Sequence, residues 1–108
     1  MSNDKKVLIV DDETDLCLLL RDYFFRKNYQ VSVAHTLKDG KFLLNLIRPD
    51  ILFLDNNLPD GTGWSIAPVI ASDYPLTYIV LISAFHPPLP MMPADAKFLA
   101  IEKTNYYG

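Results

Sequence analysis

The stretch Val7-Leu8-Ile9-Val10-Asp11-Asp12-Glu13 decides the fold, because a continuous apolar run stops abruptly at three acids. Short apolar runs bounded by polar residues are typical of strands that are buried on both faces of a parallel sheet. Three later runs end in the same manner: residues 51–54 at Asp55, 79–82 at Ser83, and 98–101 at Glu102-Lys103. Open α/β sheets bind ligands beyond the carboxyl ends of their strands. If the four strands are parallel neighbours, we expect these polar side chains to converge on one crevice.

The composition is that of one globular domain. With 108 residues, 50% hydrophobic and 21% charged, the chain can form a core and is too apolar for wholesale disorder. The net charge of −3 gives no basic footprint, so we expect no direct nucleic-acid binding. No apolar run could span a bilayer and no signal peptide precedes the first strand, which indicates a cytoplasmic protein without a membrane partner. The single cysteine, Cys17, cannot form an internal disulfide and fits a reducing compartment.

The first half of the chain has the pattern of two strand–helix units. Residues 12–27 predict a helix with acids at its start, basic residues at its end and a left-handed stop at Asn28. Its apolar stripe has the spacing of one helix face: Leu16, Leu19, Leu20, Tyr23 and Phe24. Apolar side chains alternate with others over residues 30–34, which predicts a short strand. Thr36 is placed to cap a second helix over residues 37–47.

The second half continues the alternation with two irregularities. A turn-rich loop over residues 56–63 follows the third strand, and residues 64–71 predict a helix that Pro68 should shorten or bend. Residues 78–82 and 97–101 predict two more strands, separated by a segment whose prolines at 87, 88, 90 and 93 forbid a regular helix. The pattern therefore predicts an α/β domain with a five-stranded parallel sheet, right-handed crossovers and no helix between the last two strands.

The polar side chains at the strand ends suit a divalent cation and a phosphoryl group. Asp11, Asp12 and Asp55 supply clustered carboxylates, which repel one another and favour a cation such as Mg²⁺ between them. An aspartate can also act as a nucleophile and form an acyl phosphate. Ser83 could hydrogen-bond a phosphoryl oxygen, and Lys103 could pair with another.

Four motifs in order make the chain resemble a response-regulator receiver domain, the phosphoacceptor module of two-component signalling. The resemblance covers residues 5–103 and rests on these motifs: Val10-Asp11-Asp12-Glu13, Leu54-Asp55 with Pro59 and Gly63 behind it, Ile82-Ser83-Ala84, and Lys103. It implies a doubly wound, flavodoxin-like or CheY-like sheet in the strand order 2-1-3-4-5. It also implies a single receiver domain over residues 1–108, incomplete at its C-terminus.

The resemblance assigns roles to the residues that would bind metal and phosphate. Asp55 would be the phosphorylated residue, with Asp12 as a direct Mg²⁺ ligand and Asp11 acting through water or orienting the metal. The backbone carbonyl of Asn57 would complete the protein ligands. The phosphoryl donor would be a sensor histidine kinase or a phosphotransfer protein. No enzymatic activity is implied beyond Mg²⁺-dependent self-phosphorylation and autodephosphorylation.

On the signalling side, Ser83 would be the switch hydroxyl, Lys103 the phosphate-binding cation, and the reader a downstream output domain or protein. Three departures from the family pattern fall together on this side. Thr104 follows the lysine where a proline is usual, and Ala100 stands where an aromatic switch residue is usual. The interval from Ser83 to Lys103 is 20 residues, slightly short, with prolines where a fourth helix is usual, and no fifth helix follows. We therefore expect the domain to retain phosphorylation but to pass the signal to its partner by a different surface. A homodimer is one way in which the apolar surface left by the missing helices could be covered.

Other interpretations stay open on the sequence alone. The altered face also fits a degenerate receiver that acts as a phosphorylation-independent protein-binding module. A phosphatase of the haloacid dehalogenase type also uses a strand-end aspartate, but such enzymes carry a second aspartate two residues later, where this chain has Asn57. Asp55 could merely cap a loop, and the acids at 11–13 could serve only the helix dipole. Ser83 and Lys103 could be ordinary strand-end and surface residues.

The other conspicuous side chains receive no role in the chemistry. We interpret Trp64, Phe85 and the pair Tyr106-Tyr107 as packing or partner contacts, and Cys17 as a small packed hydrophobe. His35 and His86 have no metal-ligand spacing and are assigned no function.

Overall fold

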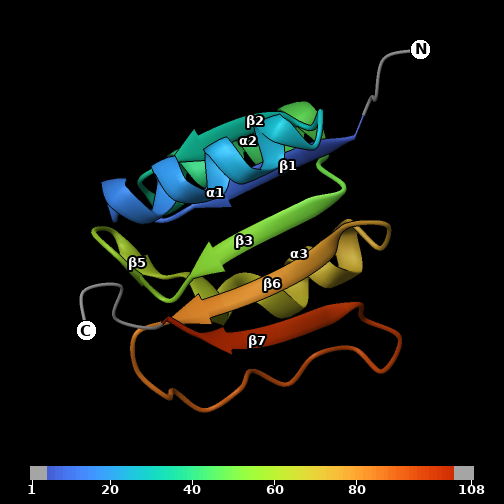
Figure 1. Cartoon of the computed structure of the whole chain (residues 1–108). Helices are drawn as coiled ribbons and strands as arrows, with labels where there is room; N and C mark the ends of the chain where they lie inside the picture. The colour runs from blue at the N-terminus through green and yellow to red at the C-terminus, as the bar shows by residue number, and fades with distance from the viewer. Residues whose placement is uncertain (1–4, 104–108) are drawn as a thin grey trace.

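A five-stranded parallel sheet runs through the molecule (Figure 1). In this computed structural model, which describes residues 5–103, the strand order is β2-β1-β3-β6-β7. The strands are β1 Lys6–Val10, β2 Gln30–Ala34, β3 Ile51–Asp55, β6 Tyr78–Ser83 and β7 Phe98–Glu102. With these five counted along the chain, the predicted order 2-1-3-4-5 is confirmed. Two short strands, β4 Asn57–Leu58 and β5 Gly61–Thr62, form an antiparallel hairpin inside the predicted loop.

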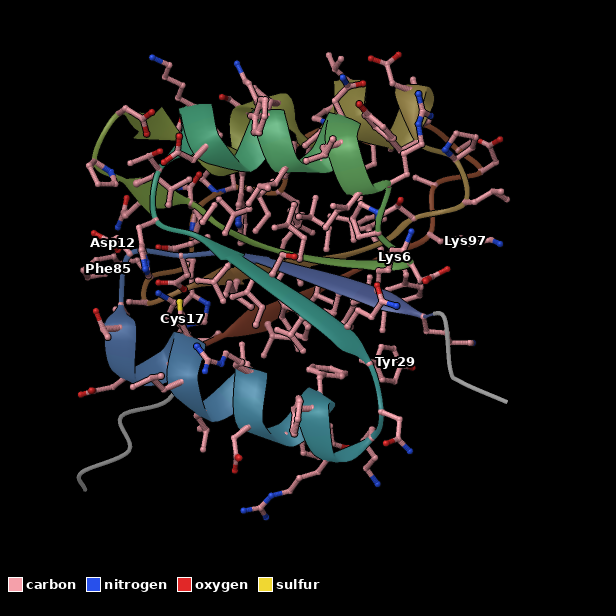
Figure 2. All side chains as sticks on the ribbon, turned by 90° about the horizontal axis from the view of Figure 1, so that it is seen from above. Lys6, Asp12, Cys17, Tyr29, Phe85 and Lys97 are labelled. Carbon is pink, nitrogen blue, oxygen red and sulfur yellow. The ribbon has the colours of Figure 1, made fainter. Side chains whose placement is uncertain are left out.

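Helices cover the two faces of the sheet unequally. α1 Thr14–Arg26 lies on one face, and α2 Leu37–Ile47 and α3 Ala67–Asp73 lie on the other. Figure 2, which looks from above, shows α1 alone on its side of the sheet. The same view places Asp12 and Phe85 at one end of the sheet and Lys6 and Lys97 at the opposite end. This arrangement confirms the doubly wound fold. Within residues 5–103, none of the helices is both long and apolar enough to cross a bilayer.

Local sequence signals set the helix ends. Thr36 caps α2, and its Oγ1 accepts a hydrogen bond from the Asp39 N–H at 3.1 Å. Asn28 has the predicted left-handed backbone after α1, with φ of 68°. α1 begins at Thr14 rather than at residue 12, because Glu13 keeps the extended backbone of an N-cap residue. The acids at 11–13 therefore stay outside the helix, at the end of β1.

The predicted apolar stripe of α1 is only partly buried. The side of the helix that packs on the sheet carries four residues: Leu16, Cys17, Leu20 and Phe24. Leu19 and Tyr23, which the spacing placed in the stripe, are 54% and 55% exposed, so the prediction is wrong for these two residues. The physical reason is that α1 lies towards the β1–β2 side of the sheet, and no helix among residues 5–103 stands next to it over β6 and β7.

The predicted helix over residues 64–71 forms as two pieces. A 3₁₀ turn, η1 Gly63–Ile66, comes first, and α3 begins at Ala67. Pro68 therefore falls in the first turn of α3, where its missing N–H would have had no helical partner. The expectation of a short or bent helix is confirmed.

The prediction of strands buried on both faces is correct for β1 and wrong for β7. Every residue from Val7 to Val10 is buried, whereas Leu99 and Ile101 of β7 are 47% and 44% exposed. As predicted, residues 84–96 contain no helix, so the outer strand is covered only by an irregular segment. The expected absence of a fifth helix concerns positions beyond Lys103, which lie outside the described residues, as do Thr104 and Tyr106-Tyr107.

Candidate functional site

The register of the sheet brings the polar strand ends together. Asp11 follows β1 and Asp55 ends β3, just beyond a matched pair of residues in these neighbouring strands. On the other side of β3, Ser83 ends β6 and lies beside Glu102 of β7. The carboxylate oxygens of Asp11, Asp12 and Asp55 lie within 4.8 Å of one another. The structure thus places the side chains of the predicted crevice at one edge of the sheet.

Lys103 lies among these acids. Its Nζ is 2.8 Å from Asp11 Oδ2, 3.0 Å from Glu13 Oε1 and 3.3 Å from Asp55 Oδ2. The Lys103 N–H donates to the Ser83 carbonyl at 2.8 Å, which ties the lysine to the end of β6. Burial lowers the pKa of Lys103, but pairing with Asp11 and Glu13 outweighs burial and raises this pKa above its ordinary value. The lysine therefore stays cationic at neutral pH.

The surroundings of Asp55 raise the pKa of its carboxyl. Its side chain is 3% exposed. Burial and the negative charge of Asp11 raise the pKa of Asp55 from 3.8 to about 6, against the opposing influence of Lys103 and of a hydrogen bond from the Asn57 N–H. Low-dielectric surroundings and a nearby like charge both disfavour the ionised carboxylate. An additional cation would favour ionisation.

The acidic group fits a divalent cation. Asp11 Oδ1 accepts the Glu13 N–H at 2.8 Å, and Asp11 Oδ2 pairs with the Lys103 ammonium at 2.8 Å. Asp12 is exposed to solvent. This all-oxygen donor set is of the kind that Mg²⁺ prefers, and Asp11, Asp12 and Asp55 are the residues that would hold it.

Ser83 and Asn57 border the acidic group. Ser83 is 1% exposed, and its Oγ accepts the N–H of Phe85 at 3.2 Å. The hydroxyl keeps its own hydrogen for a second partner. Asn57 begins β4, and its N–H donates to the Asp55 carboxylate. The carbonyl of Asn57 as a metal ligand stays a prediction.

Trp64 and Gly63 support the site in a way that the sequence did not reveal. The indole Nε1 of Trp64 donates to the carbonyl oxygens of Leu54 and Ile82 at 3.2 and 3.1 Å, and so joins the ends of β3 and β6. Gly63 lies against the backbone of Asp55, where an added Cβ would stand 2.1 Å from the Asp55 carbonyl oxygen. This close approach gives the reason for a glycine eight residues after Asp55.

Three residues around Asp11 also had no predicted role at the site. Glu13 Oε1 accepts a hydrogen bond from the Lys103 ammonium, which also pairs with Asp11. Cys17 Sγ donates to the Asp11 carbonyl oxygen at 3.2 Å, and His35 Nδ1 lies 2.9 Å from the same oxygen. Cys17 is 3% exposed, as expected of a packed residue, and burial raises the pKa of its thiol to about 11. Together these contacts fix the backbone that carries the acid pair, a function that residue type alone does not indicate.

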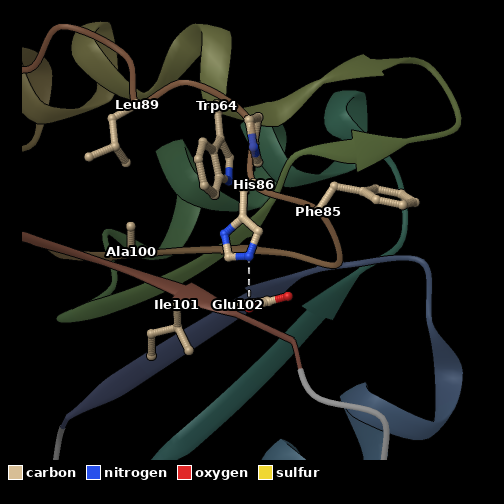
Figure 3. Close-up of a pocket in the computed structure, with 8 residues that line it drawn as sticks. Trp64, Phe85, His86, Leu89, Ala100, Ile101 and Glu102 are labelled. Carbon is tan, nitrogen blue, oxygen red and sulfur yellow. Dashed lines mark ion pairs between the residues drawn. The ribbon is translucent and has the colours of Figure 1, made fainter.

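A cavity of about 280 Å³ opens beside the site (Figure 3). Trp64, Phe85 and Leu89 line it on one side, and the residues from Ala100 to Glu102 line it on the other. An ion pair of 3.0 Å between His86 Nε2 and Glu102 Oε2 joins the two sides, as the dashed line in Figure 3 marks. The small side chain of Ala100 leaves this space open.

Comparison with known proteins identifies the class to which this fold and site belong. A family profile described as "Response regulator receiver domain" matches residues 7–94. The chain therefore belongs to the response regulator receiver domain family, the signalling modules of two-component systems that are phosphorylated on aspartate. Lys103 and β7 lie beyond the matched range, so their place at the site rests on the geometry described above.

Individual relatives agree with this assignment. The chain is 33% identical over 81 residues to the response regulator protein PilR of Pseudomonas aeruginosa, a match that covers 75% of this chain and 18% of PilR. It is 32% identical over 76 residues to the transcriptional regulatory protein YvcP of Bacillus subtilis, covering 68% of this chain and 32% of that protein. The chain thus matches only a minor part of the length of these relatives.

Solved receiver structures share the fold. A CheY-like receiver domain protein from Methanospirillum hungatei superimposes with a TM-score of 0.73 at 21% identity, covering 79% of this chain and 68% of the other. A response regulator from Burkholderia pseudomallei gives a TM-score of 0.71 at 22% identity, covering 77% of this chain and 49% of the other. That second structure carries a phosphorylated aspartic acid and a calcium ion.

Proposed function

We propose that this domain accepts a phosphoryl group on Asp55 from a phosphohistidine and thereby switches a protein–protein interaction. The observation that carries the proposal is the position of the Asp55 carboxylate, 3.3 Å from the Lys103 ammonium and beside the Asp11–Asp12 pair. The donor is a sensor histidine kinase or a phosphotransfer protein, and the reader is a downstream output domain or protein. The domain turns over no external substrate in this proposal.

In the transfer step, a carboxylate oxygen of Asp55 attacks phosphorus, the new P–O bond forms, and the P–N bond to the donor imidazole breaks. The phosphoryl oxygens then lie within reach of the Lys103 ammonium, which neutralises part of their charge. Asp11, Asp12 and Asp55 would hold the Mg²⁺, and Asn57 would add its backbone carbonyl. When bound, Mg²⁺ supplies the positive charge that lowers the barrier to attack on an anionic phosphoryl group.

Ser83 links the chemistry to a surface. Its hydroxyl hydrogen can donate to a phosphoryl oxygen, while its Oγ already accepts the Phe85 N–H that heads the irregular segment 84–96. A movement of Ser83 towards the phosphate therefore pulls on Phe85, which lines the cavity beside Ala100. We propose that the shape of this cavity, rather than an aromatic ring on β7, reports the phosphorylated state.

The test is a phosphorylation assay with a small-molecule phosphodonor and Mg²⁺, read by intact mass. The wild-type chain should gain the mass of one phosphoryl group, and Asp55→Asn should gain none. Asp60→Asn is a matched control, because Asp60 is a nearby but fully exposed acid whose carboxylate accepts the Leu37 and Lys38 N–H groups. An adduct that persists in Asp55→Asn would overturn the assignment.

A second candidate function is a degenerate receiver that binds its partner without phosphorylation. The specific observation in its favour is that Lys103 already pairs with three carboxylates while Ala100 stands beside an open cavity. Titration with Mg²⁺ and beryllofluoride, followed by NMR, separates the two candidates. Chemical shifts near Asp55 that do not move would favour the degenerate receiver.

A further inference from the structure

Trp64 connects the two residues that the proposed switch uses. Its indole N–H lies 3.2 Å from the carbonyl oxygen of Leu54 and 3.1 Å from that of Ile82. A peptide group is planar, so each of these carbonyls is rigidly joined to the nitrogen of the next residue, which is Asp55 on β3 and Ser83 on β6. A single donor therefore holds both the peptide group before the phosphoacceptor and the peptide group before the switch hydroxyl.

The turn η1, which carries Trp64, is attached more firmly to β3 than to β6. Two further bonds reach the residue that follows Asp55: the Gly63 N–H donates to the Asn56 carbonyl at 2.9 Å, and the backbone N–H of the tryptophan donates to Asn56 Oδ1 at 3.2 Å. Among the described residues, the indole bond to Ile82 is the single hydrogen bond from η1 to β6. When the two strand ends shift relative to each other, the indole should therefore stay with β3.

A hydrogen bond that is shared in this way responds to small movements. An N–H between two acceptors cannot point straight at both, and a hydrogen bond weakens steeply as its angle falls. The Ile82 carbonyl also accepts the Asn56 N–H at 3.2 Å, so it keeps a partner after the indole leaves it. A transfer of the indole N–H to β3 therefore leaves neither carbonyl without a hydrogen bond, and the penalty for a buried unpaired acceptor is avoided.

The indole also forms part of the cavity beside the site. Trp64 is 6% exposed, and it lines the cavity together with Phe85 and Ala100 (Figure 3). The ring is rigid, so a movement at Nε1 displaces all of it. Phe85 is connected to the same switch residue, because its N–H donates to Ser83 Oγ. Two residues that line the cavity are therefore connected to Ser83, Phe85 through the side chain and Trp64 through the backbone.

We propose that Trp64 is a positioning residue that carries the phosphorylated state of Asp55 into this cavity. The inference rests on the proposed phosphoacceptor function. When Ser83 moves towards the phosphoryl group, the peptide group that joins it to Ile82 turns with it. The indole N–H then passes to the Leu54 carbonyl, and the ring tilts in the cavity. Trp64 acts through the backbone of β3 and β6 and not on the reacting atoms.

The first test reads the indole N–H directly, because Trp64 is the single tryptophan of the chain. In a proton–nitrogen NMR spectrum of the full chain with Mg²⁺, the indole resonance should shift when a small-molecule phosphodonor is added. Asp55→Asn, treated in the same way, should show no shift. Ser83→Ala, compared at equal phosphorylation as measured by intact mass, should lose most of the shift, because the phosphoryl charge is present but the hydroxyl is not. A phosphorylated wild-type chain with an unshifted indole, or a shift of wild-type size in Ser83→Ala, would overturn the proposal.

The second test removes the N–H and keeps an aromatic ring. In Trp64→Phe, again compared at equal phosphorylation, the shift of the Ala100 methyl resonance on phosphorylation should be largely lost. Tyr74→Phe is the matched control, because it removes a polar group from an aromatic side chain that pairs with Asn45 outside the cavity, and it should keep the shift. A merely structural N–H would lower stability and leave the Ala100 shift in place, which would contradict the proposal. Where Trp64→Phe does not fold by circular dichroism, the first test decides alone.

The two tests also separate this inference from the proposed function. A wild-type chain that gains no phosphoryl mass contradicts the proposed function, and this inference with it. A chain that gains the mass while its indole resonance stays in place contradicts this inference alone.

Discussion

Asp55→Asn should remove the phosphoacceptor and at the same time make the folded domain more stable at neutral pH. The carboxyl of Asp55 has a pKa of about 6 in the fold against an ordinary value of 3.8. Each pKa unit is worth about 1.4 kcal/mol, so the ionised carboxylate costs the folded state about 3 kcal/mol at pH 7.5. Asparagine keeps the shape of the side chain and removes this charge.

The sign of the pH dependence follows from the same pKa. Because the pKa of Asp55 is raised in the fold, its contribution to stability is fully present below pH 3.8 and is lost as the pH rises through 6. The advantage of Asp55→Asn should therefore be largest above pH 7 and vanish near pH 4. Mg²⁺ should stabilise the wild-type domain more than the variant, because it neutralises the same carboxylate.

Urea unfolding between pH 4 and pH 8, with and without Mg²⁺, measures both effects. Asp60→Asn is again the control, because two N–H bonds lower the pKa of Asp60 and its replacement should not stabilise the fold. If Asp55→Asn is no more stable than the wild-type domain at pH 7.5 in the absence of Mg²⁺, the reasoning about the buried charge is wrong.

Three further predictions concern neighbouring residues. Lys103→Met should slow phosphorylation yet tighten Mg²⁺ binding, because the ammonium competes with the metal for Asp11; calorimetry that finds weaker binding would contradict this. Gly63→Ala should lower the free energy of unfolding by about 1–3 kcal/mol, since its methyl group would collide with the Asp55 carbonyl, and an unchanged urea midpoint would exclude the collision. The thiol of Cys17, with a pKa of about 11, should react with iodoacetamide far more slowly in the folded domain at pH 8 than in urea, and equal rates would show that it is accessible.

The sequence was sufficient for the sheet and for the acidic crevice, because both depend on local pattern. A run such as Val7–Val10 has the composition of a buried parallel strand, and parallel strands put the residues that follow them at one edge. Asp11 and Asp55 could therefore be predicted as neighbours before their distance was known. The cap at Thr36 and the stop at Asn28 depend on adjacent residues alone.

Features that depend on distant contacts could not be predicted. Nothing in the residue type of Glu13 distinguishes a partner of Lys103, 90 residues away, from a helix-terminal acid. The exposure of Leu19 and Tyr23 depends on whether a second helix stands beside α1, and apolar spacing counts such residues as core in either case. The sequence indicates only a packing or partner contact for Trp64, because an indole that bridges two strand-end carbonyls has no signature in the sequence.

Lys103 comes directly after β7, the outermost strand, and this position affects how readily Asp55 can accept a phosphoryl group. Strands with few buried contacts open locally more often than the rest of a fold, and β7 is such a strand. When β7 detaches from β6, the ammonium departs with it and two buried carboxylates face each other without a counter-charge. The rate of amide hydrogen exchange in β7 should therefore change with pH as Asp55 titrates. A protein that holds β7 against β6 would keep Lys103 beside Asp55 and so favour phosphorylation without contacting any of the acids.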